Sequence, residues 1–264
     1  MDGAASGKGA TTVDGGASGA NSRSIFGYAG GTNSLTQNGA AIGFNAQSVD
    51  GGAAGNGAVT RNGGASGAGA RSTDGFAGGH LSSTQTGGAV GDHASSTTGF
   101  AGGDHAATRD GVAVGDHASA LPRNSTAVGK NSRAEAEDSV ALGANSVATE
   151  SHTVSLGTPG HEQRITNLAP GIAGTDAVNV NQLNSVRRDA ESAAAAAIAV
   201  AGLPQAYVPG RSMLAAAGGT YQGETAVALG LSTISENGHW IYKGAFTTNN
   251  RGKYGATLGV GYQW

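Results

Sequence analysis

The feature that most constrains the fold of this chain is a three-residue motif, Ala-x-Gly, that recurs through its first half at a constant spacing. Successive motif alanines are twelve residues apart up to Ala113, and two more follow at steps of fourteen. They are Ala5, Ala17, Ala29, Ala41, Ala53, Ala65, Ala77, Ala89, Ala101, Ala113, Ala127 and Ala141. A fixed period of this kind predicts stacked repeats, each of which depends on its neighbours for stability.

Other columns of the repeat indicate two short strands and two corners per coil. The position three residues after each motif glycine is always Ala or Ser, which predicts an interior too narrow for branched side chains. One corner directly follows the motif glycine, and the other is rich in Asp-Gly and Asn-Gly pairs such as Asp14-Gly15 and Asn38-Gly39. At these pairs we expect glycine to adopt a positive φ. Each repeat is therefore predicted to form one coil of a β-solenoid, with coils about 4.8 Å apart.

Composition supports a repeat rather than a conventional globular core. The 264 residues include 48 Gly and no Cys, and only 5% are aromatic. The few large apolar residues beside the motif are expected to pack against other copies of the same coil; they are Val90, Val112, Val114, Val128, Val140 and Leu142. A formal net charge of -3 gives no reason to expect a nucleic-acid partner. The absence of Cys fits export through an oxidising compartment.

The last part of the chain, residues 203–264, predicts four membrane-spanning strands. From Thr225 onward, three segments alternate large apolar side chains with small or polar ones, and aromatic residues stand near the strand ends. A weaker fourth strand is expected from about Arg211 to Gln222. We expect one face to contact lipid through Val227, Leu229, Leu231, Trp240, Tyr242, Phe246, Tyr254, Leu258, Val260, Tyr262 and Trp264. The opposite face is expected to line a lumen with Ala226, Ala228, Gly230, Gly255, Gly259 and Gly261.

Four strands are too few to close a barrel, since the smallest single-chain barrels need about eight. An open edge in lipid would leave backbone groups unpaired. The chain must therefore pool strands with other copies, and three copies would supply twelve. The small residues on the inner face would leave room for something narrow in the lumen.

The segment between the repeats and the strands predicts a connector followed by a helix. We expect the helix to start after Thr175-Asp176 and to stop at Gly202 and Pro204. A coiled-coil seam is expected along Val180, Leu183, Arg187, Ala190, Ala194, Ala197 and Ala201. The alanine-rich half of this helix is narrow enough to thread a barrel.

The connector carries the most specific motifs of the chain, Val154 to Gly157, Arg164 to Asn167 and Gly174 to Leu183. They resemble the neck of the trimeric autotransporter adhesins, the YadA-like family of type Vc secretion. The matching residues are Val154, Gly157, Arg164, Ile165, Thr166, Asn167, Gly174, Thr175, Asp176, Ala177, Val178, Asn179, Gln182 and Leu183. The repeats resemble the family's head and the last strands its anchor. The twelve-residue spacing departs from the family's usual repeat, which is nearer fourteen.

The resemblance implies a mainly β chain in four parts. Residues 1–150 would form a left-handed parallel β-roll head that is trimeric, and residues 151–184 a neck. Residues 185–202 would form a short coiled-coil or pore helix. Residues 203–264 would form a YadA-like outer-membrane anchor, contributing four strands to a twelve-stranded trimeric transmembrane β-barrel.

The implied function is a surface adhesin, exported through its own trimeric barrel and displayed for attachment to host cells or matrix, or for autoaggregation. Its expected location is the outer membrane and cell surface of a Gram-negative cell. Expected partners are two further copies of the chain, the outer membrane with its insertion machinery, and an unidentified host ligand. The alternative is a structural anchor and spacer whose binding element lies in a missing N-terminal part. Met1 is followed by Asp2-Gly3-Ala4 with no basic and apolar leader, so we expect N-terminal sequence to be missing.

Catalysis and cofactors are not expected, because the sequence has no Cys and no Gly-x-Ser-x-Gly motif. One corner of three successive coils nevertheless carries Asp-His pairs: Asp92, His93, Asp104, His105, Asp116 and His117. The ordinary interpretation is an exposed turn that favours Asp and tolerates His. The alternative is a stacked ladder of zinc or copper ligands.

Overall fold

Within the described residues, the protein is mainly β with one helix. A computed structural model describes residues 3–264. The chain divides into two compact units, Met1–Arg164 and Ile165–Trp264, which we call the repeat unit and the C-terminal unit. No helix within the described residues is long and apolar enough to cross a membrane.

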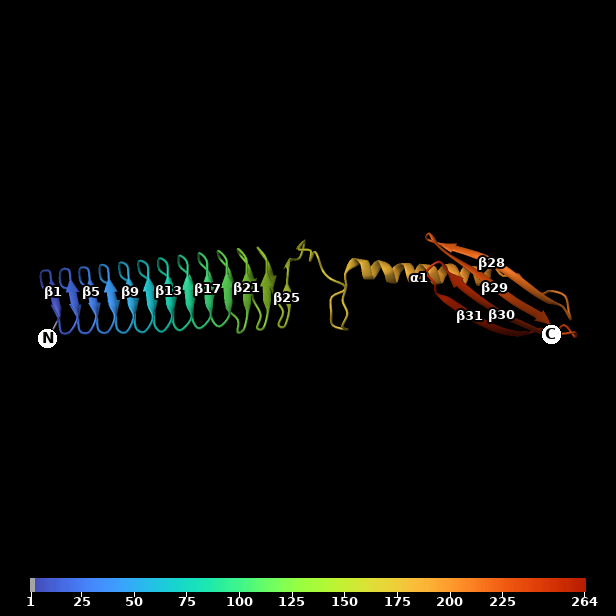
Figure 1. Cartoon of the computed structure of the whole chain (residues 1–264), viewed down its shortest axis with the longest axis horizontal. Helices are drawn as coiled ribbons and strands as arrows, with labels where there is room; N and C mark the ends of the chain where they lie inside the picture. The colour runs from blue at the N-terminus through green and yellow to red at the C-terminus, as the bar shows by residue number, and fades with distance from the viewer. Residues whose placement is uncertain (1–2) are drawn as a thin grey trace. The chain divides into compact units, whose positions relative to one another are not determined.

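The repeat unit is a parallel β-solenoid, and each coil contributes one strand to each of two sheets (Figure 1). The first sheet contains β1 (Ala4–Ser6), β3 (Gly16–Ser18), β5 (Tyr28–Gly30), β7 (Ala40–Ile42), β9 (Gly52–Ala54), β11 (Gly64–Ser66), β13 (Phe76–Gly78), β15 (Gly88–Val90), β17 (Phe100–Gly102), β19 (Val112–Val114), β21 (Thr126–Val128), β23 (Val140–Leu142) and β25 (Val154–Ser155). The second contains β2 (Thr11–Thr12), β4 (Arg23–Ser24), β6 (Leu35–Thr36), β8 (Gln47–Ser48), β10 (Val59–Thr60), β12 (Arg71–Ser72), β14 (Ser83–Thr84), β16 (Ser95–Ser96), β18 (Ala107–Thr108), β20 (Ser119–Ala120), β22 (Arg133–Ala134) and β24 (Val147–Ala148).

Equivalent residues of successive coils pair in register, so the period in the sequence becomes the register of the sheets. Ala41 pairs with Ala53, and Ala113 pairs with Ala127 across the first fourteen-residue step. The predicted β-solenoid with two strands per coil is therefore confirmed. A small antiparallel pair, β26 (Gly157–Thr158) and β27 (His161–Glu162), follows the last coil.

The interior of the solenoid is filled by the small residues that the repeat places there. The motif alanines from Ala17 onward are buried, and the largest fully buried side chains are Thr36 and Thr60. Buried serine hydroxyls donate to the motif glycine carbonyls of their own coil, as Ser34 does to Gly31 at 2.9 Å. Burial of one methyl-sized group contributes only about 0.8 kcal/mol. The backbone hydrogen bonds between coils are therefore a large share of what holds the stack together.

The prediction that the Asp-Gly and Asn-Gly corner needs a positive φ is wrong. Positive φ occurs instead at the motif glycines and two residues beyond them, for example 131° at Gly43 and 57° at Asn45. The corner glycines are required for a different reason, close approach of successive coils. A Cβ added to Gly51 would lie 2.0 Å from the carbonyl oxygen of Gly63 in the next coil. Only glycine leaves room for that contact.

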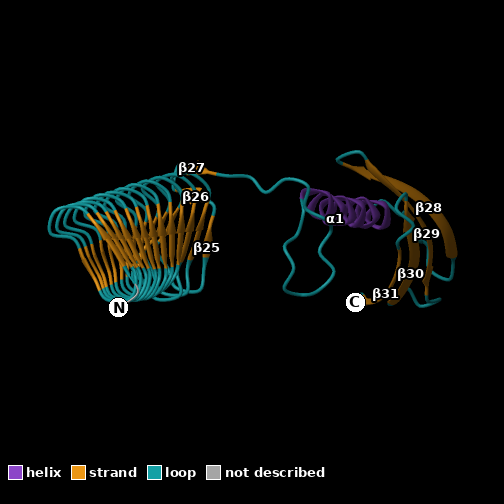
Figure 2. Cartoon of the chain, turned by 60° about the vertical axis from the view of Figure 1, so that its left-hand side comes forward, coloured by secondary structure: helices purple, strands orange, loops and turns teal. Residues whose placement is uncertain are grey.

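The C-terminal unit is an antiparallel sheet of four strands in sequential order with one helix packed on it. The strands are β28 (Ser212–Tyr221), β29 (Glu224–Ile234), β30 (Trp240–Asn249) and β31 (Tyr254–Tyr262). The helix α1 (Val180–Ala201) packs on β28, β29 and β30, and Figure 2 shows it beside the concave side of the curved sheet.

The helix begins later than predicted, at Val180 rather than after Thr175-Asp176. Asn179 is its N-cap and forms a capping box with Gln182, satisfying backbone donors at the start of the helix. The Asp176 carboxylate instead accepts hydrogen bonds from the backbone N–H groups of Ile172 and Ala173, each at 2.9 Å. These two hydrogen bonds lower the pKa of Asp176. Asp176 therefore stabilises the turn before the helix, and α1 starts inside the predicted neck.

The helix and sheet backbones approach each other closely at Gly219 of β28. A Cβ added there would lie 2.3 Å from the carbonyl oxygen of Ala195 and 2.6 Å from the backbone nitrogen of Ala199. Ala195 and Ala199 are fully buried in the same contact. Glycine at position 219 is therefore what allows α1 to lie directly on the sheet.

We expect Gly51→Ala to destabilise the repeat unit by about 1–3 kcal/mol, because its Cβ would overlap the next coil's backbone. Gly52→Ala is the matched control, since a Cβ at Gly52 would meet nothing within 4 Å. It should be neutral or slightly stabilising, by up to about 1 kcal/mol. Thermal unfolding of the full chain followed by circular dichroism checks both variants. Equal melting temperatures would contradict the close-approach explanation.

We expect Gly219→Ala to displace α1 from the sheet and to destabilise the C-terminal unit by about 1–3 kcal/mol. Gly218→Ala provides the control, because the nearest atom to its added Cβ lies 3.9 Å away. Protease protection of the helix in purified full chain is the measurement. Protection that is the same in the two variants would show that position 219 is not the critical contact.

Candidate functional site

The outer face of the C-terminal sheet is an apolar surface that no other part of the C-terminal unit covers. The large residues of β29 on this face, such as Leu229 and Leu231, are about 60% exposed, whereas the alternate residues Ala226 and Ala228 are buried. The sheet register places Leu229 beside Phe246, and Leu231 on the same face. All the residues predicted to face lipid are exposed: Val227, Leu229, Leu231, Trp240, Tyr242, Phe246, Tyr254, Leu258, Val260, Tyr262 and Trp264.

Aromatic residues of this outer face form two groups at opposite ends of the strands. At one end, the rings of Trp240 and Tyr262 meet edge to face, with centroids 5.0 Å apart. At the other end, the rings of Phe246 and Tyr254 are stacked with centroids 6.4 Å apart. Two aromatic bands that flank an aliphatic zone are typical of strands that cross an outer membrane.

On the inner face of the sheet, the helix packs mainly on β28, β29 and β30. Ala226 and Ala228 pack with α1, and a Cβ added to Gly230 would lie 2.8 Å from the Leu203 side chain. The other small residues predicted to line a lumen are on β31, and Cβ atoms added to Gly259 and Gly261 would meet nothing within 4 Å. The structure therefore brings Ala226 and Ala228 against the helix and Gly230 against Leu203, just after the helix. On β31, an added Cβ at Gly255 would meet only the Thr247 side chain, and Gly259 and Gly261 stay open.

The helix side chains that contact the sheet are not those of the predicted coiled-coil seam. The buried helix residues are Ser192, Ala195 and Ala199. Val180 and Leu183, at the start of the seam, are more than 60% exposed. The helix thus has one face on its own sheet and a second, apolar face that no part of the C-terminal unit covers.

Polar contacts that fix the helix on the sheet were missed by sequence reasoning. Arg251, in the turn between β30 and β31, donates from Nε to the Asp189 carboxylate and from a terminal nitrogen to the Ser185 hydroxyl. The Asn249 side-chain amide donates to the Ser192 hydroxyl at 3.0 Å. These partners lie about sixty residues apart in the sequence, so only the fold brings them together. The sequence offered one signal for these contacts: Ser185, Asp189 and Ser192 are polar residues on a helix face that continues with small side chains.

The predicted neck residues fall in both units. Val154, Gly157 and Arg164 belong to the repeat unit, and the remainder belong to the C-terminal unit. Gln182 pins the segment before the helix, accepting from the Gly171 N–H at 2.9 Å and donating to the Gly171 carbonyl at 3.0 Å. Asn179 donates to the Leu168 carbonyl at 3.1 Å. The apolar neck residues Ile165 and Val178 remain more than 60% exposed.

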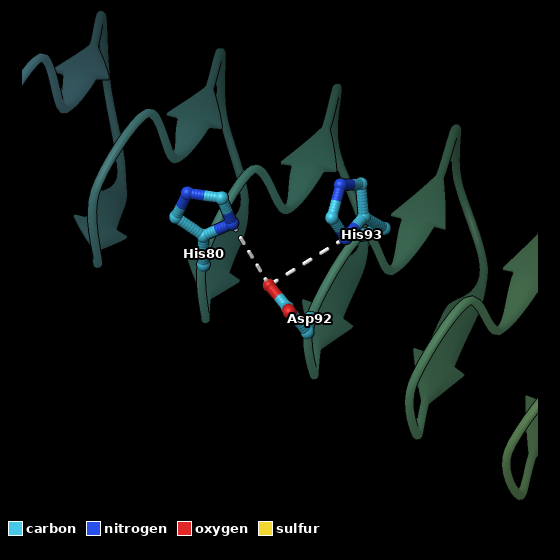
Figure 3. Close-up of side chains that lie close together, drawn as sticks. All are labelled: His80, Asp92 and His93. Carbon is cyan, nitrogen blue, oxygen red and sulfur yellow. Dashed lines mark hydrogen bonds and ion pairs between the residues drawn. The ribbon is translucent and has the colours of Figure 1, made fainter.

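The Asp-His corners of the repeat unit stack as a ladder on its surface. The imidazole rings of His93 and His105 are parallel with centroids 4.8 Å apart, and those of His105 and His117 follow at 5.0 Å. His80, which sequence reasoning missed, occupies the column of Asp92 one coil earlier. Its Nδ1 lies 3.1 Å from the Asp92 Oδ1 (Figure 3). The twelve-residue step from His80 to Asp92 was the signal that could have found it.

Comparison with protein families gives one consistent result along the chain. Residues 204–264 match the YadA-like membrane anchor domain, and residues 164–202 match the coiled stalk of trimeric autotransporter adhesin. Two copies of the YadA head domain repeat match residues 109–132 and 134–158. These copies cover the part of the solenoid in which the spacing lengthens to fourteen.

Similar proteins carry names from the same family. Over 112 residues the chain is 49% identical to autotransporter adhesin NhhA of Neisseria meningitidis serogroup B, covering 38% of this chain and 19% of that protein. Over 127 residues it is 40% identical to autotransporter adhesin EhaG of Escherichia coli O157:H7, covering 40% of this chain and 8% of that protein. The chain thus spans a fifth or less of the length of these relatives.

A similar solved structure is the collagen-binding domain of the Yersinia adhesin YadA, at 25% identity and a TM-score of 0.29. The match covers 65% of this chain and 86% of that one.

The anchor match and the adhesin relatives place the chain at the outer membrane and cell surface. The head, stalk and anchor profiles belong to one family and together cover more than half of the chain. They match successive segments, in the order head, stalk and anchor. The chain is therefore a member of the YadA-like trimeric autotransporter adhesins.

Proposed function

We propose that this chain acts as a homotrimeric surface adhesin of a Gram-negative cell, exported through its own barrel and displayed for attachment to host cells or matrix, or to sister bacteria. The observation that carries the proposal is the C-terminal sheet with its two different faces. Its outer face is apolar with aromatic ends, and its inner face holds a helix made largely of small residues. That arrangement suits a wall between lipid and a filled lumen.

Unpaired strand edges support assembly from several copies. β28 and β31 are the two edges of the sheet, and each pairs with one neighbour in the described chain. Backbone groups left unpaired in lipid would cost several kcal/mol each. Joining β31 of one copy to β28 of the next removes every edge, and three copies give the predicted twelve strands. The exposed second face of α1 and the uncovered glycines of β31 would then meet helices of the other copies.

Within this assembly we assign the parts of the chain as follows. Residues 1–150 form the head, residues 151–184 the neck, residues 185–202 the pore helix and residues 203–264 the anchor. The neck includes the first turn of α1, because the capping residues Asn179 and Gln182 also hold the Gly171 segment. The neck motif residues Asn179 and Gln182 thus hold the Leu168–Gly171 segment to the first turn of the helix.

Two kinds of partner follow from this arrangement besides the other copies. Trp264, which is 99% exposed after β31, offers an aromatic side chain to the outer-membrane insertion machinery. The displayed head offers its surface to a ligand of a host cell or matrix, or to another bacterium. The family is one of adhesins, which indicates a role without catalysis.

The second candidate is a structural anchor and spacer, with the binding element outside the head described above. The observation that favours it is the length of the relatives, which are at least five times as long as the segment that this chain matches. The uniform coils of the repeat unit would suit a spacer as well as a binding surface. A binding test of the displayed head separates the two candidates.

The test is expression of the chain behind an export leader in a non-adherent Gram-negative host. Cells should attach to matrix proteins or cultured host cells, or aggregate with one another, and unheated outer membranes should show a band at three times the chain mass. Cells displaying residues 151–264 alone are the matched control and should not attach. Attachment that is absent from both strains, with normal trimer bands, would favour the spacer. Only soluble monomer would refute the assembly.

The substitution Trp264→Ala should lower the amount of trimer in the outer membrane several-fold, because the exposed aromatic ring that follows β31 would no longer be available to the insertion machinery. The matched control is Gln263→Ala, which keeps Trp264 and should leave the amount of trimer unchanged. Quantitative surface labelling measures the effect. A normal amount of trimer at the surface after the substitution would disprove this role of Trp264.

A further inference from the structure

We propose that the head binds one divalent transition-metal ion of the zinc class at a corner shared by two successive coils. The ligands are Nδ1 of His80, the carboxylate of Asp92 and Nδ1 of His93 (Figure 3). The site is independent of the export and adhesion functions proposed above. It lies on the surface, with each of the three side chains about half exposed.

The separations between these ligand atoms suit a tetrahedral ion. Both histidines approach the same oxygen, Asp92 Oδ1, His80 from 3.1 Å and His93 from 3.6 Å. Two ligands bound at 2.0–2.1 Å in tetrahedral geometry lie about 3.3 Å apart. All three ligand atoms lie within 4.8 Å of one another. Small side-chain rotations would therefore bring the three ligand atoms to bonding distance of one ion, with a water as the fourth ligand.

The chemistry of the three groups favours zinc over calcium or magnesium. Imidazole nitrogens suit Zn²⁺, Cu²⁺ and Ni²⁺, whereas Ca²⁺ and Mg²⁺ prefer sets made entirely of oxygens. Two imidazoles and one carboxylate with an open fourth position form a common zinc ligand set.

The backbone holds the two coils at a fixed distance, so the site is largely formed before an ion arrives. The N–H of His93 donates to the carbonyl of His80 at 2.9 Å, as part of the hydrogen-bond ladder between coils. The two side chains therefore belong to neighbouring rungs of one rigid stack. Preorganisation of this kind reduces the entropy lost on binding.

The backbone conformation does not by itself require histidine at these corners. His93 has a φ of 55°, and the same position is filled by Asn45 and Asn131, each with a φ of 57°. In the column of His80, other coils carry Asn56 and Ala68. Asparagine therefore satisfies the turn, and the imidazoles add a ligating group that the fold does not need.

A second three-residue group, His93, Asp104 and His105, lies one coil further on and shares His93. Within it, Asp104 Oδ1 is buried without a hydrogen-bond partner among the described residues and lies 3.2 Å from His105 Nδ1. Because His93 is shared, we expect one ion per chain rather than two. We assign the ion to the first group because both of its histidines approach a single carboxylate oxygen.

The test is titration of the detergent-extracted full chain with ZnCl₂ by calorimetry, and with CoCl₂ by visible absorption, which reports tetrahedral coordination. We expect one equivalent of Zn²⁺ per chain. His80→Asn and His93→Asn should each weaken binding by at least about tenfold, since loss of a group that only orients a metal ligand already costs about 10–100-fold. Zn²⁺ should raise the melting temperature of the unsubstituted head but not of these variants.

His117→Asn is the matched control, because His117 has the same backbone conformation, with a φ of 59°, and stacks on His105 but belongs to neither group. It should bind Zn²⁺ normally, as should His105→Asn. Equal melting temperatures of all variants in EDTA would establish that each is folded. Absence of Zn²⁺ binding by the unsubstituted chain overturns the proposal. Loss of binding in His105→Asn but not in His80→Asn overturns the assignment to the first group.

Discussion

Close, in-register contact between backbones is the constraint on which the rest of this structure depends. In the repeat unit, each coil lies so close to the next that a single Cβ at a corner such as Gly51 would overlap a carbonyl oxygen. In the C-terminal unit, α1 lies against Gly219 at a similar distance. Both units therefore use small residues to bring main chains together, and neither builds a core of large side chains.

This use of small residues has a consequence for how the chain is stabilised. The buried alanines and serines contribute little apolar area, so backbone pairing between coils carries more of the stability than in a globular domain. Large apolar side chains are instead displayed outward, on both the solenoid and the sheet, where Phe76 and Leu258 are examples. Exposed apolar surfaces of this kind mark sites of contact with lipid or with another copy of the chain.

The sequence was sufficient to predict the repeat architecture, because a strict period translates directly into register. The alternation along β29 likewise predicted which residues turn away from the helix. The sequence could not show why glycine is required at each corner. A glycine that recurs in every repeat identifies the residue type, but it does not show which backbone atom of the next coil lies beside it. The helix start was misplaced because Asp176 and Asn179 are both good capping residues, and only the hydrogen bonds distinguish their roles. Contacts such as Arg251 with Asp189 join distant positions and leave no local pattern.

The in-register stack also makes the head adjustable in whole units. Because successive coils pair through equivalent backbone groups, insertion or deletion of one complete repeat preserves the backbone pairing of the remaining coils. The loss of a single residue, in contrast, would shift the alanines of that coil out of the interior. Unequal recombination between the similar repeats can therefore lengthen or shorten the solenoid in steps of about 4.8 Å, the spacing of one strand. The length of the solenoid is thus a heritable quantity that can change without a new fold.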